Sequence, residues 1–274
     1  MSTTPLTSEQ ISELANALSS ARKDVRILDG FPGPIPSTLA EAYVVQDGSI
    51  AASDQPIVGW KVGMVPPDLR DELGAERILG PVFKDVCITL TEQQSKGQAF
   101  ELPVFAGGFI AIEPELVFET NQDIAPGSIN TADGVEHLVK AAYAGIEIAS
   151  SPVIDLNGYG PTAIASDIGN QYGVILGTSI SDWKTAIATM ETSTTINDEL
   201  INTAPTDGIF NGPLSAFAFM IDCCAERGIT LPAGSLCSSG AITGVHETLV
   251  GSTSTVKFGD VCTMNFTLVD NKKA

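Results

Sequence analysis

The sequence has few of the residues that support disulfide, zinc or histidine chemistry. It contains only two histidines, His137 and His246, and its five cysteines include no CxxC pair. An odd number of scattered cysteines favours buried thiols in a reducing cytoplasm over a disulfide framework or a zinc site. We therefore expect a cytoplasmic protein with free thiols.

Basic residues and long apolar runs are also scarce. Lys and Arg number 14 against 33 Asp and Glu, which gives a formal net charge of −19. This charge repels phosphate backbones and anionic lipid, so we expect neither nucleic acid nor membrane as a partner. No apolar run approaches the roughly 18 residues of a membrane helix, and the first residues lack the pattern of a secretory signal. An anionic substrate would need a local positive centre.

The chain instead has the composition of a globular protein. Its 274 residues are 43% hydrophobic, enough to bury a sizeable core as one domain, or as one domain with a small appendage. Capping boxes at Thr7 and Gln10, and again at Thr38 and Glu41, predict helices over 7–22 and 37–52. We expect an N-terminal helical layer over residues 1–55 and a β-rich domain over 56–274.

Short apolar segments separated by Gly, Pro and Asp indicate strands in the larger part. The predicted strands are 57–64, 80–90, 109–119, 143–150, 171–177 and 259–270. Helical insertions are predicted at 66–74, 131–145 and 211–228. No internal repeat interrupts this organisation.

Two glutamates stand one residue apart in the strand-like stretch AIEPELVFE, residues 111–119. Because side chains alternate along a strand, Glu113 and Glu115 share one face, either as an exposed polar face or as part of a site. Pro114 indicates an edge strand or an irregular strand, and Glu147 lies in a similar apolar setting. Three carboxylates without a nearby His or Cys are the ligand set of a hard cation, Mg²⁺ or Mn²⁺.

Lys61 is the cationic candidate, because it stands in the apolar stretch GWKVGM. A lysine flanked in this way is either paired or catalytic, or it lies on the exposed face of an edge strand. Asp85 follows a Gly-Pro turn in GPVFKDV, where turn chemistry alone could explain it.

These motifs occur in an order that resembles a known family. The series AYVVQD, GWKVGM, GPVFKDV, IEPELVFE, GIEIASSP and GSLCSSGAITG resembles the 2-keto-4-pentenoate hydratase group of the fumarylacetoacetate hydrolase superfamily, whose relatives include 4-oxalocrotonate decarboxylases. The resemblance implies an α+β fold, a mixed β-sandwich roll with a small N-terminal helical layer and peripheral helices, assembled as a homo-oligomer.

The resemblance also implies a set of site residues. Glu113, Glu115 and Glu147 match the metal-binding glutamates of the family, with Mg²⁺ or Mn²⁺ as the metal. Lys61 and Asp85 match the Lys and Asp beside the substrate. Ser239 stands where the family has a small hydroxyl residue near the substrate carboxylate.

The implied activity is that of a metal-dependent hydratase, a carbon–oxygen lyase. It would add water to a 2-hydroxydienoate or 2-oxo-alkenoate through a metal-stabilised enolate and give a 4-hydroxy-2-oxo acid. A decarboxylase of a 2-oxo dicarboxylate would use the same residues, and a catalytically silent metal-binding protein is a further alternative.

The chain departs from the family in two places. The segment DLNGYGPTAIASDIGN, residues 155–170, replaces the usual loop after the third glutamate, and His246 stands where relatives often have an apolar stretch. His246 is either a pocket acid–base or, as we favour, a structural loop histidine. A DWSARD-like stretch and an N-terminal His-Glu pair are both missing, which argues against hydrolysis of a carbon–carbon bond.

Overall fold

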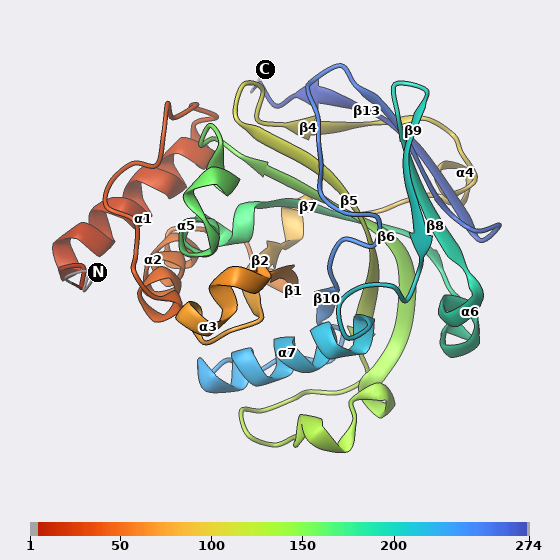
Figure 1. Cartoon of the computed structure of the whole chain (residues 1–274), viewed down its shortest axis with the longest axis horizontal. Helices are drawn as coiled ribbons and strands as arrows, with labels where there is room; N and C mark the ends of the chain where they lie inside the picture. Colours follow the sequence, from red (N-terminus) through yellow and green to blue (C-terminus); the bar gives the residue numbers. More distant parts are fainter. Residues whose placement is uncertain (1–4, 273–274) are drawn as a thin grey trace.

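A computed structural model describes residues 5–272 of the chain (Figure 1). Two β-sheets face one another across the main hydrophobic core, and a group of helices covers the outer face of the larger sheet. The sheets are mixed, since parallel pairs such as β1 with β10 stand beside antiparallel ones. The predicted α+β fold with a mixed β-sandwich is confirmed.

The larger sheet has eight strands in the order β2-β1-β10-β5-β6-β7-β3, and β11 pairs with β5 outside this path. Its strands are β1 (Ile57–Met64), β2 (Arg77–Phe83), β3 (Cys87–Thr89), β5 (Phe109–Thr120), β6 (Val139–Ser151), β7 (Gln171–Ser179), β10 (Leu236–Ser238) and β11 (His246–Glu247). The smaller sheet has five strands in the order β4-β13-β12-β8-β9. These are β4 (Phe100–Val104), β8 (Glu191–Ile196), β9 (Glu199–Pro205), β12 (Thr253–Phe258) and β13 (Cys262–Asp270).

The helices lie outside the two sheets (Figure 1). The α-helices are α1 (Ser8–Lys23), α2 (Leu39–Ala51), α3 (Arg70–Leu73), α4 (Glu92–Ser95), α5 (Pro161–Ser166), α6 (Trp183–Thr189) and α7 (Pro213–Glu226). The 3-10 turns are η1 (Pro67–Leu69), η2 (Lys84–Val86), η3 (Thr131–Asp133), η4 (Glu136–Leu138), η5 (Leu156–Tyr159) and η6 (Ile168–Asn170). Among the described residues, none of the helices is long and apolar enough to cross a membrane.

The predicted caps explain where the first two helices begin. At α1 both halves of the capping box form, because Thr7 accepts from the Gln10 backbone and Gln10 reaches back to Thr7. At α2 only half of the box forms. Thr38 caps the helix, but the Glu41 side chain instead accepts from the backbone N–H groups of Leu6 and Ser37. Glu41 therefore ties the segment before α1 to the start of α2.

The predicted helix over 131–145 is wrong. That segment contains two 3-10 turns and then enters β6, which pairs with β5 from Val139 to Ser151. The long antiparallel pairing with β5 outweighs the local helix propensity of this segment.

Strand β5 separates two environments. Ile110, Ile112, Leu116 and Phe118 enter the main core between the sheets. Phe109 and Ala111 pack on the opposite side, against α1 and α2 residues. The sheet face that carries Glu113 and Glu115 is therefore the one covered by the helices, and not the one that faces the second sheet. The division of the chain at residue 55 falls between α2 and β1 and stays a prediction.

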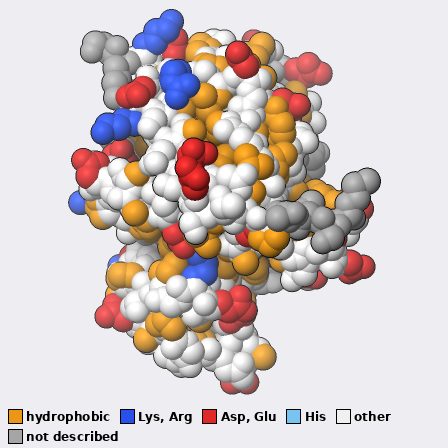
Figure 2. Space-filling view, turned by 90° about the vertical axis from the view of Figure 1, so that its left-hand side faces the viewer, with side chains coloured by type: hydrophobic (Ala, Val, Ile, Leu, Met, Phe, Trp, Pro, Cys, Tyr) orange, Lys and Arg blue, Asp and Glu red, His pale blue; other side chains and the backbone are white. Residues whose placement is uncertain are grey.

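Charged side chains of both signs are interspersed on the face shown in Figure 2, among scattered apolar side chains. The five cysteines are free thiols, and four of them are buried while Cys87 is half-buried. The expectation of free thiols is thus confirmed.

Candidate metal and catalytic site

The three predicted glutamates form one buried cluster. Glu113 lies directly opposite Glu147 in the pairing of β5 with β6, and Glu115 lies opposite Gly145. Their exposed fractions are only 6% for Glu113, 1% for Glu115 and 1% for Glu147. One carboxylate oxygen from each residue lies within 4.8 Å of the others. The alternative of an exposed polar strand face is therefore wrong.

Burial and mutual repulsion make this cluster electrostatically unfavourable. Burial raises the pKa of Glu113 to about 8, and the neighbouring charge of Glu147 adds to the shift. Burial also raises the pKa of Glu115 and of Glu147 above the usual range of a carboxyl group. Lys61 opposes the shift at Glu113 and Glu147, because its positive charge favours their ionised forms.

Lys61 supplies the one ammonium group in contact with this cluster among the described residues. It comes from β1, which lies inside the sheet between β2 and β10, and its exposed fraction is 3%. Its Nζ lies 3.1 Å from Glu147 Oε1 and 3.0 Å from Asn170 Oδ1. Burial lowers the pKa of Lys61, but the glutamate charges outweigh it, so the pKa is raised and the amine is held protonated. The alternative of an exposed edge-strand lysine is wrong.

Ser238 belongs to the cluster but was not predicted. Its Oγ donates a 2.5 Å hydrogen bond to Glu115 Oε2, and it lies opposite both Lys61 and Val117 in the sheet register. This contact fixes one oxygen of Glu115. The SSG motif indicated a hydroxyl residue at this place, but strand alternation brings the first serine to the carboxylates.

Ser239, the predicted substrate-binding residue, is fully buried. Its backbone N–H donates to the Leu116 carbonyl, and its Oγ has no hydrogen-bond partner among the described residues. A buried hydroxyl without a partner is unusual, because desolvating a polar group without a compensating hydrogen bond is unfavourable. Its role stays a prediction.

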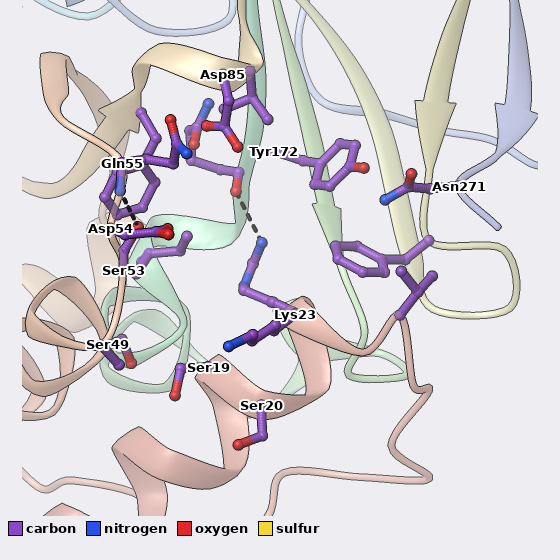
Figure 3. Close-up of a pocket in the computed structure, with 18 of the residues that line it drawn as sticks. Ser19, Ser20, Lys23, Ser49, Ser53, Asp54, Gln55, Asp85, Tyr172 and Asn271 are labelled. Carbon is purple, nitrogen blue, oxygen red and sulfur yellow. Dashed lines mark hydrogen bonds between the residues drawn. The ribbon is translucent and has the colours of Figure 1, made fainter. Parts of the chain in front are cut away.

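Asp85 is not a member of the glutamate cluster. It is an exposed residue of η2, on the wall of a cavity of about 630 Å³. Ser19, Ser20 and Lys23 of α1 also line this cavity, and Tyr172 lines its other side (Figure 3). The three glutamates and Lys61 are not among the residues that line it. The structure thus brings together Lys61 and the glutamates but not Asp85, whose catalytic role stays a prediction.

His246 lies in β11, outside the glutamate cluster, and its structural role stays a prediction. It pairs with Ile112 through β11, so its side chain lies on the Ile112 side of the sheet and not on the Glu113 side. Its Nε2 lies 2.9 Å from Thr243 Oγ1, and partial burial lowers its pKa.

The donor set fits a hard divalent cation. Carboxylate oxygens are the ligands that Mg²⁺, Mn²⁺ and Ca²⁺ prefer. The oxygens lie within 4.8 Å of one another, a separation no greater than about two Ca²⁺–oxygen bonds of ~2.4 Å each. Neither oxygen of Glu147 accepts a well-formed hydrogen bond from a described residue. Three carboxylates and one ammonium leave two negative charges, which one divalent cation would neutralise.

No protein-family model and no curated protein matches the chain. Solved structures do resemble it over most of its length. The 4-oxalocrotonate decarboxylase from Pseudomonas putida G7, complexed with magnesium and adipate, superposes with a TM-score of 0.78 at 22% identity, covering 97% of this chain and all of that one.

More distant structures share the fold over a smaller part. The 2-hydroxyhepta-2,4-diene-1,7-dioate isomerase from Mycobacterium marinum has a TM-score of 0.55 at 16% identity, covering 80% of this chain and 78% of that one. Fumarylpyruvate hydrolase from Pseudomonas aeruginosa, in complex with Mn²⁺ and pyruvate, has a TM-score of 0.53 at 14% identity, covering 80% of this chain and 93% of that one.

At sequence identities of 14% to 22%, the superposition on these structures shows a shared fold and no more. The resemblance indicated by the ordered sequence motifs is confirmed at the level of the fold. The chain has the fold of 4-oxalocrotonate decarboxylase and its relatives in the fumarylacetoacetate hydrolase superfamily.

Proposed function

We propose that the chain is a divalent-metal-dependent enzyme that acts on a small 2-oxo or 2-hydroxydienoic acid. Glu113, Glu115 and Glu147 would hold Mg²⁺ or Mn²⁺. The observation that carries the proposal is the burial of three carboxylates around one ammonium, because this arrangement is strongly unfavourable without a further positive charge. The solved relatives contain magnesium with adipate and Mn²⁺ with pyruvate, and both organic ligands are small carboxylic acids.

The substrate class follows from the charge of the site. A bound divalent cation would act as a Lewis acid on the carboxylate and 2-oxygen of the substrate and would offset the charge that develops on that oxygen. In a chain with a net charge of −19, it would also attract an anion that the surface repels. Low solvent exposure at the site would strengthen each of these interactions.

Lys61 is the proposed proton carrier. The carboxylates keep its amine protonated, so it would act first as an acid that donates a proton to the reacting acid. Glu147 holds the Nζ group from one side and would restrict its motion. Ser238 would orient Glu115, and the unpartnered Oγ of Ser239 would bind the substrate carboxylate. Asp85 would act from the cavity side, as a residue that orients water.

The favoured reaction is hydration. A proton would move from the 2-hydroxyl group of the dienol to the carbon chain, and water would then add at the distal carbon of the resulting unsaturated ketone. The product would be a 4-hydroxy-2-oxo acid.

Decarboxylation of a 2-oxo dicarboxylate is the second candidate, and the structural likeness to 4-oxalocrotonate decarboxylase over nearly the whole chain favours it. Here the bond to a carboxylate would break, its electrons would enter the conjugated ketone, carbon dioxide would leave and Lys61 would protonate the carbon. The resemblance also leads us to propose a homo-oligomer in the cytoplasm.

One incubation separates these reactions. The protein is mixed with 2-hydroxypenta-2,4-dienoate, or with 4-oxalocrotonate, in Mg²⁺ or in EDTA, while dienol absorbance and product mass are followed. Hydration adds the mass of water to the first substrate, and decarboxylation removes the mass of carbon dioxide from the second. Turnover that persists unchanged in EDTA would contradict the metal-dependent proposal, and no turnover of either acid would contradict the substrate class.

A further inference from the structure

The turn that follows α5 touches the Lys61 amine. Three consecutive residues of this turn, Ile168, Gly169 and Asn170, have left-handed backbone conformations with φ of 50°, 74° and 53°. Asparagine tolerates this region, but a β-branched isoleucine rarely adopts it. A strained turn persists only where its surroundings hold it, and such turns occur often at functional sites.

Two glycines, Gly80 on β2 and Gly169 in the turn itself, allow the turn to pack closely against β2 and the Lys61 side chain. A Cβ at Gly80 would lie 2.4 Å from the Ile168 carbonyl oxygen. A Cβ at Gly169 would lie 3.0 Å from the Lys61 Cε atom. Both positions therefore need to lack a side chain, and the turn packs directly on the stem of the lysine.

The turn is also fastened to the N-terminal helix. The Arg22 guanidinium binds both carboxylate oxygens of Asp167, at 2.8 and 2.6 Å, and donates to the Gln171 carbonyl at 3.0 Å. Asp167 is completely buried, and Arg22 is mostly buried. A bidentate pair of this kind fixes geometry as well as charge, so both ends of the turn are held to α1.

We propose that Asn170 is a positioning residue that orients the Lys61 amine toward the substrate. This inference rests on the proposed function, in which Lys61 transfers the proton. Asn170 Oδ1 accepts from Lys61 Nζ at 3.0 Å, while its Nδ2 donates to Asn157 Oδ1 at 3.3 Å. A protonated lysine amine has three donors and no acceptor, so the amide oxygen of Asn170 must face Lys61 Nζ. The hydrogen bond from Asn170 Nδ2 to Asn157 stabilises this orientation of the amide.

The amine is thereby held from two sides. Asn170 Oδ1 and Glu147 Oε1 lie at 3.0 and 3.1 Å from Nζ. An ammonium carries three N–H groups in fixed directions, so the hydrogen bond to Asn170 together with the ion pair to Glu147 restricts where the other N–H groups point. Without Asn170 the amine would keep its contact with Glu147 but would rotate about it, and misdirected groups lose catalytic rate.

The test compares Asn170→Gly with Asn211→Gly. Glycine accepts the left-handed backbone at both positions, and Asn211 is an exposed asparagine with φ of 55°. We expect kcat of Asn170→Gly to fall about 10- to 100-fold, with KM and the Mn²⁺ dissociation constant nearly unchanged. Asn211→Gly should keep the wild-type kcat. A kcat of Asn170→Gly equal to that of Asn211→Gly would overturn the proposal.

A double-mutant cycle in urea, read without any substrate, tests the contact itself. The shift in unfolding midpoint caused by Asn170→Gly should shrink when Lys61 is already replaced by Met, because the contact is then gone. An equal shift in both backgrounds would overturn the inference. Absence of wild-type turnover would instead refute the proposed function, and the urea cycle would still decide whether Asn170 and Lys61 interact.

Discussion

Glu113 and Glu147 face each other directly across β5 and β6, both buried, with no intervening strand residue to separate their charges. Like charges directly opposite each other destabilise a sheet. Lys61 contacts only the Glu147 side of this pair within hydrogen-bonding distance. Protons, metal ions and the lysine therefore compete for the same carboxylates in this cluster.

The first prediction concerns pH without metal. The pKa of Glu113 is about 8 in the folded protein and about 4.3 in an unfolded chain. Between these values the folded protein keeps a proton that the unfolded chain has lost, so the free energy of unfolding falls as pH rises from about 4.3 to about 8. Urea unfolding in EDTA at pH 5, 6.5 and 8 measures this decline.

Glu113→Gln is the control for that measurement, since glutamine does not titrate. As pH rises, the free energy of unfolding of the wild type should fall further than that of Glu113→Gln, so the variant becomes the relatively more stable protein. A difference that stays constant over the window would show that Glu113 has an ordinary pKa.

The second prediction concerns metal binding. Mn²⁺ or Mg²⁺ should raise the melting temperature, by an amount that corresponds to about 2.7 kcal/mol when the free ion is at 100 times its dissociation constant. Binding should also release protons at pH 7, because the ligands have raised pKa values. Calorimetry in two buffers of different ionisation enthalpy measures the release. Glu115→Gln should weaken binding strongly, and a variant that binds as tightly as the wild type would refute the ligand assignment.

The third prediction separates Lys61 from the metal ligands. Lys61→Met leaves Glu147 without its ion-pair partner, so the metal-free protein should lose about 3–5 kcal/mol of stability. Turnover should fall on the order of 10²- to 10⁴-fold, as expected for loss of a proton carrier.

Metal affinity should behave in the opposite way, because the substitution removes a positive charge that competes for Glu147. Titration with Mn²⁺ should give an affinity equal to or tighter than that of the wild type. A loss of metal binding in Lys61→Met would mean that the lysine supports the metal site and does not compete with it.

The fourth prediction distinguishes two adjacent serines. Ser238 donates to Glu115, so Ser238→Ala should weaken metal binding about 10- to 100-fold. Ser239 has a buried, unpartnered Oγ, so Ser239→Ala should raise KM for the acid while metal affinity stays the same. Metal titrations and steady-state kinetics on the two variants test both statements. A raised KM in Ser238→Ala and weakened metal binding in Ser239→Ala would reverse the two assignments.

The sequence predicted those parts of the site that depend on local rules. Strand alternation placed Glu113 and Glu115 on one face, and the similar apolar setting of Glu147 suggested the third member. The apolar neighbours of Lys61 left a paired or catalytic lysine and an exposed edge-strand lysine both open, and its burial excludes the second. The cap at Thr7 located the first helix to the residue.

Other features depend on contacts between distant segments. Asn170 reaches Lys61 because the strained turn that contains Gly169 packs closely on Gly80 of β2, and nothing in its sequence neighbourhood indicates this. The helix predicted over 131–145 failed because pairing with β5 decides the conformation of that segment. Asp85 was identified by its motif, whereas its position depends on how η2 leaves the sheet.

The alternation of β5 has a consequence for how this stretch can vary. Apolar residues of one parity fill the core between the sheets, and glutamates of the other parity enter the site. Inserting or deleting one residue ahead of Glu113 would exchange the two sets, sending carboxylates into the core and isoleucines to the cluster. Single substitutions at either set change one contact, but a change of length would destroy both. The number of residues in β5 is thus more tightly constrained than the identity of any one of them.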